Sequence, residues 1–403
     1  MTDLDLRPGL SGLTQEALEA WLVARGDPAY RARQVMTGLW AGARSAADVH
    51  VLPAGLRGAL DEAFRFDTIA STELVVSDGS RTEKAVHRLS DGAVIESVLM
   101  HYPARAGQRE RNTVCISSQA GCAVGCPFCA TGELGFGRDL STAEILDQVR
   151  EAAGRLAARG RRLTNIVFMG MGEPLLNLDR VLEAVDALND PDRFGLGARH
   201  ITVSTSGVVP GIRRLTALGP QFTLAISLHA GRDALRDVLV PLNRRWPVRE
   251  VIAAAREHAA KTRRRISYEV TLIAGINDTD ADADAIVGLL RGDLAHVNLI
   301  PMNPVAHTPW TASPMPVIER FAEQLRGAGI QTTVRRNRGQ EIGAACGQLA
   351  ADRAGAPSPA AVSRRRELLV RQSVAALRGD RAPDDGILAV PTAALPGADR
   401  GAR

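Results

Sequence analysis

The sequence predicts an α/β fold in which six β/α units form an open, partial (β/α)6 barrel. Three observations predict it. Strand-like and helix-like segments alternate from about residue 112 onward, polar and glycine-rich motifs follow the strands, and hydrophobic residues make up 45% of the 403-residue chain. Alternation of this kind is typical of parallel β/α units. The hydrophobic content is sufficient for the core of a large domain.

We expect smaller parts on both sides of this barrel. Apolar–polar patterning and loop signals divide the chain into a small N-terminal helical domain, an antiparallel strand extension, the barrel domain, a C-terminal helix and a tail expected to be disordered. The tail is rich in Ala, Pro, Gly, Asp and Arg and has few aromatic residues. The predicted boundaries are 1–70, 71–111, 112–350, 351–378 and 379–403.

The predicted elements follow from periodicity and flanking turn residues. Helices of the N-terminal domain are expected over 15–24, 29–40 and 55–64, and antiparallel strands over 73–76, 84–89 and 93–100. Barrel strands are expected over 113–117, 165–169, 200–204, 223–228, 267–273 and 296–300, with a final strand over 331–334. Helices between them include 142–156, 179–188 and 281–290.

Bulk properties exclude several classes of protein. No run of about 18 apolar residues is present, so a membrane-spanning helix is not expected. The first twelve residues carry Asp3 and Asp5 and lack an apolar centre, unlike a secretory signal. Five cysteines in 403 residues do not form a disulfide framework. We therefore expect a cytoplasmic protein, monomeric and without a membrane partner.

The charge balance permits an RNA partner without requiring one. The formal net charge is +4, and of 49 basic residues only Lys84 and Lys261 are lysine. Arginine is a good ligand for phosphate. This skew, however, is typical of biased coding composition and says little by itself about function.

Three cysteines share one loop, Gly121 to Ala130, with the spacing CxxxCxxC at Cys122, Cys126 and Cys129. A structural zinc site usually has four protein ligands in two separated pairs, and no fourth ligand is nearby in the sequence. Three thiolates suit a four-iron cluster and leave one iron open for another ligand. Glycine and proline within the loop supply its turns. The motif therefore predicts a [4Fe-4S] cluster rather than three unrelated buried cysteines.

The CxxxCxxC motif resembles the signature of the radical S-adenosylmethionine (SAM) superfamily. The resemblance implies that the open iron chelates the amino and carboxylate groups of SAM, and that an electron from the cluster cleaves the sulfonium to a 5′-deoxyadenosyl radical. It also implies a radical-SAM barrel as the fold. A reductant such as flavodoxin is expected to supply the electron.

Candidate SAM contacts lie where the predicted strands end, which is where parallel β/α folds place their sites. Glu173 and the backbone at Gly172 suit an amino group, and hydroxyl or amide side chains suit ribose and carboxylate. Ser204 and Ser227 can instead be strand-terminal caps, and His229 can equally be a packed core histidine. The candidate residues are Gly172, Glu173, Ser204, Ser227, Leu228, His229 and Asn303.

The remaining two cysteines indicate a more specific family within this superfamily. Cys115 precedes the cluster loop, where a buried apolar role is an equal alternative, and Cys346 lies in an irregular loop with Gly339, Gly343 and Gly347. Together with other motifs they resemble the RlmN family of rRNA and tRNA adenine-C2 methyltransferases over roughly residues 13–349. The matching segments are Val94–Val98, Cys115–Cys122, Gly170–Asn177, Ser204–Pro210, Ser227–Ala230, Pro301–Pro304 and Ala345–Gln348.

The resemblance implies roles for three residues. One SAM would methylate Cys346, and the radical from a second would abstract hydrogen from that methyl group, so that the methylene radical adds to adenine C2. Cys115 would release the product through a transient disulfide with Cys346. Glu96 would accept the C2 proton, although taken alone it reads as an exposed strand residue. The substrates would be 23S rRNA and tRNA, and the enzyme would take part in rRNA and tRNA processing.

The RNA partner would be held around the target base. An enzyme that reaches C2 has to take the base out of its stack. The N-terminal domain and Arg335, Arg336 and Arg338 are candidates to hold the RNA backbone, the alternative for these arginines being a solvated surface. Binding should then weaken with salt.

Two rival functions remain. A Cfr-type adenine-C8 methyltransferase uses the same two-cysteine chemistry, but Pro174 favours the C2 family, because alanine is expected there in the rival. A non-methylating iron–sulfur protein that binds RNA or transfers electrons is the rival from another class. Such a protein needs neither the Gly170–Pro174 loop nor Cys346.

Overall fold

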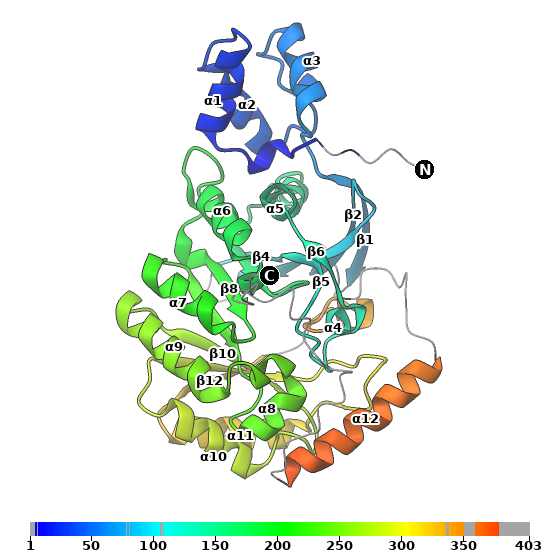
Figure 1. Cartoon of the computed structure of the whole chain (residues 1–403), viewed down its shortest axis with the longest axis vertical. Helices are drawn as coiled ribbons and strands as arrows, with labels where there is room; N and C mark the ends of the chain where they lie inside the picture. Colours follow the sequence, from blue (N-terminus) through cyan, green and yellow to red (C-terminus); the bar gives the residue numbers. More distant parts are fainter. Residues whose placement is uncertain are drawn as a thin grey trace, which may run out of the picture.

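A computed structural model describes residues 5, 7–77, 79, 81–104, 107, 109–335, 338–349 and 359–378. Within these residues, ten strands form one mixed sheet in the order β1-β2-β3-β4-β7-β8-β9-β10-β11-β12. β1 (Ile69–Ser77) and β12 (Gln331–Val334) lie at opposite ends of this order, so the sheet is open (Figure 1). The predicted α/β fold with a partial barrel is confirmed.

The sheet changes character at β4 (Arg111–Cys115). On one side, β1, β2 (Thr82–Leu89), β3 (Val94–Tyr102) and β4 pair antiparallel. On the other side, β4 pairs parallel with β7, and every later neighbour in the order is also parallel. These strands are β7 (Asn165–Phe168), β8 (Ile201–Thr205), β9 (Thr223–Ser227), β10 (Ile266–Leu272) and β11 (Ala295–Pro301).

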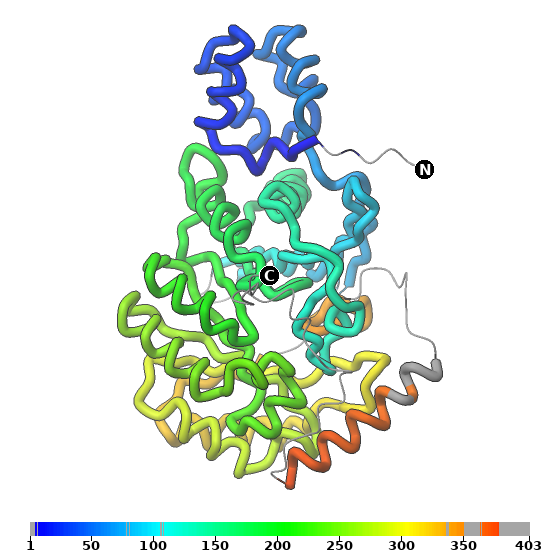
Figure 2. The backbone as a smooth tube through the Cα atoms, viewed as in Figure 1, coloured from blue at the N-terminus to red at the C-terminus, as the bar shows by residue number. Residues whose placement is uncertain are grey.

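Helices connect the successive parallel strands and cover the outer side of the curved sheet (Figure 1). The tube in Figure 2 shows this path as an arc that runs from green to yellow. The carboxyl ends of the strands therefore gather at one edge, where loops can form a site. The connecting helices are α5 (Thr142–Ala157), α6 (Leu178–Asn189), α7 (Val209–Leu218), α8 (Asp233–Leu239), α9 (Val248–Thr262), α10 (Asp280–Leu290) and α11 (Met315–Gly327).

The N-terminal helices α1 (Gln15–Ala24), α2 (Arg31–Trp40) and α3 (Ala54–Ala63) pack around a small apolar core of their own. They stand at one end of the molecule, apart from the barrel core (Figure 1). Thr14 begins α1 by accepting a hydrogen bond from the Ala17 amide, as an N-cap residue does.

A buried arginine of α5 joins these helices to the barrel. Arg150 donates to the carbonyls of Leu39, Ala43 and Phe66 and to the Asp147 carboxylate at 2.6 Å. Asp147 in turn accepts from the Thr68 amide and hydroxyl. Because both charges are paired and hydrogen-bonded, burial is tolerated here and the two parts are held in one arrangement.

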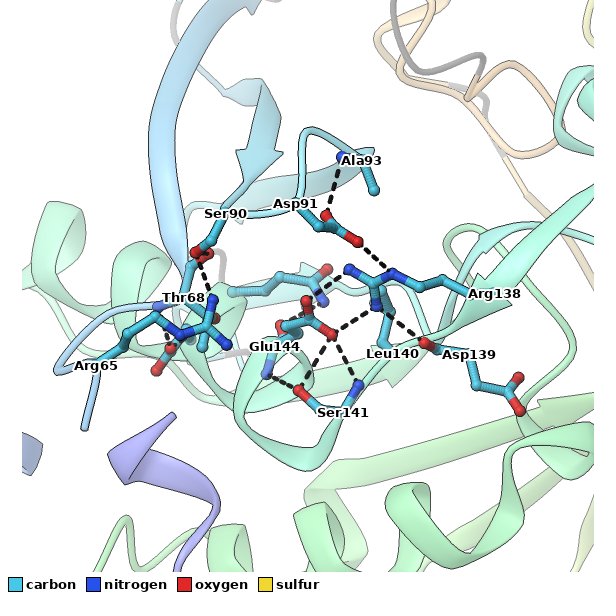
Figure 3. A network of polar contacts seen from close by, with 12 residues as sticks. Arg65, Thr68, Ser90, Asp91, Ala93, Arg138, Asp139, Leu140, Ser141 and Glu144 are labelled. Carbon is cyan, nitrogen blue, oxygen red and sulfur yellow. Dashed lines mark hydrogen bonds and ion pairs between the residues drawn. The ribbon is translucent and has the colours of Figure 1, made fainter. Parts of the chain in front are cut away.

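A second polar network holds the start of α5 (Figure 3). Ser141 and Glu144 form a capping box, and the Glu144 carboxylate also receives two hydrogen bonds from Arg138. Arg138 reaches Asp91 in the β2–β3 turn at 2.6 Å. Arg138 belongs to β6 (Phe136–Asp139), so this network ties the short β5–β6 sheet to the strand extension.

The remaining regions are the C-terminal helix, the tail and the short strands around the clustered cysteines. The C-terminal helix α12 (Pro359–Leu377) packs on α8, whereas the predicted tail, 379–403, lies outside the described residues. The structure also contains elements that were not predicted: the short sheet of β5 (Gln119–Gly121) and β6, and the short helix α4 (Ala130–Leu134) between them. No helix of the described residues is both long and apolar enough to cross a membrane.

Asp67 at the domain junction predicts a pH-dependent stability. Burial, and next the Asp147 charge, raise the pKa of Asp67 to about 6, against an opposing ion pair with Arg44 at 2.6 Å. An acid whose pKa is raised by folding stabilises the fold in its protonated form. Its contribution is therefore lost as the pH rises from about 4 to about 6.

We expect Asp67→Asn to remove this dependence. The difference in free energy of unfolding between Asp67→Asn and the unchanged protein should move in favour of the variant by up to about 3 kcal/mol across that window. Denaturant unfolding at a series of pH values measures it. A pH-independent difference would contradict the prediction.

Candidate functional site

The three clustered cysteines lie in the loop between β5 and α4. Gly121 begins the loop with φ +80°, and a Cβ placed there would meet the Gly135 carbonyl at 2.0 Å, so only glycine fits. The Cys129 amide donates to the Cys126 carbonyl at 3.0 Å, which makes the turn that presents both side chains on one side of the chain. The short β5–β6 sheet thus forms the base of the CxxxCxxC loop.

All five cysteines line a single cavity at the carboxyl ends of the parallel strands, and all five are free thiols. The cavity brings together most of the residues predicted from sequence, which come from separate loops. They are Cys115, Cys122, Cys126, Cys129, Gly172, Glu173, Ser204, Ser227, His229, Asn303 and Cys346. Glu96 and Leu228 are absent from the described lining.

The donor set fits an iron–sulfur cluster, because three thiols of one loop line the cavity and thiolates are the usual ligands of such clusters. Within the described residues, no group of three His, Cys, Asp or Glu side chains is placed to hold a single ion. Burial raises the pKa of Cys122 to about 12, so a cationic partner is needed to hold it as thiolate.

Glu173 is held in the cavity wall as a hydrogen-bonded carboxylate. It is 4% exposed and accepts from the Ser206 amide at 2.7 Å and the Ser206 hydroxyl at 2.6 Å. Burial raises the pKa of Glu173, and these hydrogen bonds oppose the rise. Gly172 before it has φ +100°, and a Cβ there would meet Gln119 at 2.6 Å. The segment can present a carboxylate to an amino group.

The predicted strand-end residues differ in whether their side chains are already hydrogen-bonded or buried. Ser204 lines the cavity, but its hydroxyl donates to the Phe168 carbonyl at 2.6 Å. Ser227 also lines the cavity. The Leu228 side chain is completely buried, so this residue contributes its backbone to the strand end rather than a side chain to the cavity.

His229 lies in the left-handed region with φ 59°, a strained conformation for a non-glycine residue. Its Nδ1 accepts from the Thr271 amide at 3.1 Å, which leaves the proton on Nε2. Burial lowers its pKa to about 3, so the ring is neutral at ordinary pH. The ring centroid lies 4.6 Å from that of Phe128 in the cluster loop. His229 is therefore packed against the cluster loop as well as facing the cavity.

The loop that carries Cys346 is bonded directly to the cluster loop. The Ala130 amide donates to the Gly347 carbonyl at 2.7 Å. Asn303 donates to the Cys346 carbonyl at 2.9 Å and accepts from Gln340 at 2.6 Å. In this structure the Asn303 amide thus orients the Cys346 loop.

Cys115 and Cys346 face the same cavity and differ in exposure. Cys115 is 9% exposed in β4, and burial raises its pKa to about 12. Cys346 reaches solvent through the opening, but surrounding protein atoms still raise the pKa of its thiol, and Arg335 opposes the rise. Arg335 lines the cavity 3.9 Å from Glu269, and its side chain is 38% exposed. Arg336 lies outside the described residues.

Glu96 is buried, whereas its strand position alone predicts an exposed residue. It is 1% exposed on β3, and Lys84 Nζ lies 3.2 Å from its Oε1. Strand residues two apart share a face, which places Glu96 on the same face as the cavity-lining Val98 and Met100. A Cβ added to Gly343 would be 3.5 Å from Lys84 Nζ, so the ion pair lies beside the Cys346 loop.

Lys84 and Arg236 also belong to the site, although neither was predicted from the sequence. The register of β2 against β3 brings Lys84 to Glu96, and no local signal in the sequence gives that register. Arg236 of α8 is completely buried and donates to the carbonyls of Ser206, Ser227 and Leu228. It therefore joins the carboxyl ends of β8 and β9 beneath the cavity.

Comparison with known proteins identifies relatives over most of the chain. The Radical SAM superfamily matches residues 116–287. A protein of Parafrankia sp. (strain EAN1pec) named "Probable dual-specificity RNA methyltransferase RlmN" is 50% identical, covering 85% of this chain and 91% of its own. A protein of the same name from Salinispora arenicola is 47% identical, covering 85% of this chain and 90% of its own.

Solved structures agree with these relatives. The crystal structure of a radical SAM methyltransferase from Sphaerobacter thermophilus is similar, with a TM-score of 0.81 and 47% identity. The match covers 86% of this chain and 100% of that chain. The similarity therefore extends well beyond the superfamily segment, residues 116–287.

Arg236 provides a test of how the site is built. Arg236→Met should lower the free energy of unfolding by about 3–5 kcal/mol, because carbonyls that it satisfies lose their donor inside the protein. Arg213→Met is the matched control. Arg213 is exposed and 3.7 Å from Glu257, so its replacement should cost at most about 1 kcal/mol. Equal effects in denaturant unfolding would contradict the role of Arg236.

Proposed function

Because the chain belongs to the RlmN family of radical SAM methyltransferases, we propose that it methylates C2 of adenosine in 23S rRNA and tRNA. The observation that carries the proposal is the cavity shared by Cys115, Cys346 and the three cysteines of the CxxxCxxC loop. A radical generator alone needs only the loop cysteines. Two further thiols facing the same space support a methyl carrier and a group that resolves it.

The residues fit the two cofactors that the family implies. Cys122, Cys126 and Cys129 would hold a [4Fe-4S] cluster, and Glu173 with the Gly172 backbone would accept the amino group of SAM. The bound cofactors would supply a methyl group, an electron and the 5′-deoxyadenosyl radical, with two SAM consumed per turnover and an external reductant such as flavodoxin. The residues around the cavity orient these groups and exclude water.

The methyl group would be carried by Cys346 as a thioether. Its position at the cavity opening lets the thiol meet both the bound cofactor and an incoming base. Arg335 supports methylation of this thiol because a nearby positive charge favours the thiolate. After addition to C2, the Cys115 thiolate would attack the Cys346 sulfur, so that an S–S bond forms while the S–CH2 bond to the base breaks. The released methylene would take up a proton to become the methyl group, and an external reductant would return the disulfide to two thiols.

Glu96 would accept the proton that leaves C2. Its carboxylate is buried beside the ammonium of Lys84, and the pair lies at the side of the Cys346 loop. A buried carboxylate needs such a partner to stay ionised, and only the ionised form can accept a proton.

Nucleoside mass spectrometry of rRNA and tRNA from cells with and without the gene tests the proposal. We expect 2-methyladenosine to disappear on deletion. Loss of 8-methyladenosine instead would identify the Cfr-type activity. If reduced, anaerobic protein with an intact cluster released no 5′-deoxyadenosine, the non-methylating iron–sulfur reading would stand.

The two carrier cysteines should fail in different ways. Cys346→Ala should abolish methyl transfer and leave the iron content unchanged, because the methyl carrier is lost while the cluster ligands stay. Cys115→Ala should still attack RNA but should accumulate a covalent protein–RNA adduct, visible by denaturing gel. Free product at a normal rate from Cys115→Ala would exclude the resolving role.

Glu96→Gln should slow formation of methylated RNA by about 10²- to 10⁴-fold, the range for loss of a proton acceptor. Formation of 5′-deoxyadenosine should continue, because radical generation does not use this carboxylate. The matched control is Glu73→Gln, an exposed residue on β1 of the same sheet extension. Turnover by Glu96→Gln equal to that of the control would remove Glu96 from the mechanism.

A further inference from the structure

Two arginines share one aromatic ring at the rim of the cavity. The guanidinium carbon of Arg111 lies 4.2 Å from the ring centroid of Tyr102, and that of Arg338 lies 4.4 Å from it. Both distances are within the range of a cation–π contact. We call Arg111 and Arg338 the arginine pair.

The arginine pair is assembled from distant parts of the chain. Tyr102 and Arg111 are register partners at the open end of the β3–β4 pairing. Arg338 arrives from the segment after β12 and donates through Nη1 to the His101 carbonyl at 3.1 Å. The ring and this hydrogen bond restrict the two side chains, so a ligand would find them already ordered.

The arginine pair lies at the edge of the cavity that contains Cys115 and Cys346. Tyr102 and Arg338 line the same cavity as Cys115 and Cys346, whereas Arg111 is exposed. The pair therefore extends from the cavity wall to the outer surface. Enzymes that act on a base take it out of its stack into a pocket, so the backbone of such a nucleotide would stay outside the cavity.

The charge of the pair is not neutralised by nearby carboxylates. Glu110 lies 3.7 Å from His101 and 3.9 Å from Arg161, and Glu269 lies 3.9 Å from Arg335. Within the described ranges, neither Arg111 nor Arg338 is within salt-bridge distance of an Asp or Glu. By contrast, the exposed Arg256 and Arg320 pair with Asp293 and Asp280.

We propose that the arginine pair binds backbone phosphates of the RNA beside the target adenosine. This inference rests on the proposed function, because it takes RNA to be the substrate. Guanidinium groups match phosphate oxygens with two parallel N–H donors, and phosphate contacts fix the register of a nucleic acid without reading its bases. The Tyr102 ring orders the arginines for this task.

The test measures binding of an unmodified tRNA transcript to cluster-loaded protein without reductant, so that no turnover occurs. Filter binding over a series of salt concentrations gives the affinity and its salt slope. Arg111→Ala and Arg338→Ala should each weaken binding by about tenfold near physiological salt. Each should also reduce the slope of log affinity against log salt by about 0.7–0.9, the value for one phosphate contact.

Controls separate this role from general charge and from folding. Arg249→Ala removes the same charge from an exposed position on α9 and should leave the slope unchanged. Tyr102→Phe keeps the ring and should bind normally, whereas Tyr102→Leu should weaken binding with both arginines present. Iron content and thermal unfolding verify that each variant is folded.

The possible outcomes separate a failure of the phosphate-binding inference from a failure of the proposed function. If the double variant Arg111→Ala/Arg338→Ala keeps the salt slope of Arg249→Ala, the inference is wrong even when 2-methyladenosine is formed. Competition by polyglutamate as strong as that by the tRNA transcript would also overturn it, because the pair would then bind any anion. A pair-dependent slope in a protein that forms no 2-methyladenosine would refute the proposed function while supporting the phosphate contacts.

Discussion

The architecture of the site depends on a buried positive charge. Arg236 is completely enclosed, and burial lowers its pKa to about 10, yet a guanidinium of this pKa still remains charged at neutral pH. Its donors satisfy the carbonyls of Ser206, Ser227 and Leu228, where neighbouring strands end. Buried backbone carbonyls need a hydrogen-bond donor, and here a side chain supplies it. Arg236 therefore allows these strands to stop together and open a cavity above them.

The parallel part of the fold could be predicted because its strands are short, carry buried apolar residues and alternate with helices along the chain. Such strands read as short apolar runs bounded by polar motifs, and the motifs fall at the same edge of the sheet. The short β5–β6 sheet could not be predicted, because β5 spans only Gln119–Gly121 and pairs with residues beyond α4. Three residues carry no recognisable period, so this pairing depends on the whole loop.

The candidate site was predictable to the extent that its chemistry is local. The CxxxCxxC spacing is contained in one loop, and Glu173 follows a strand within a glycine-rich segment. The positions of the other site residues depend on tertiary contacts that the sequence does not show. Glu96 reads as exposed from its strand, but the register of β2 buries it beside Lys84. Asn303 was predicted to contact SAM; it lines the cavity, and a tertiary contact that the sequence does not show also bonds its amide to the Cys346 loop.

The hydrogen bond from the Ala130 amide to the Gly347 carbonyl joins two loops that are far apart in the sequence. It makes the backbone of the CxxxCxxC loop continuous with the backbone that carries Cys346. A shift of either loop would therefore move the other, so the four thiols on these loops are positioned together rather than by two independent loops.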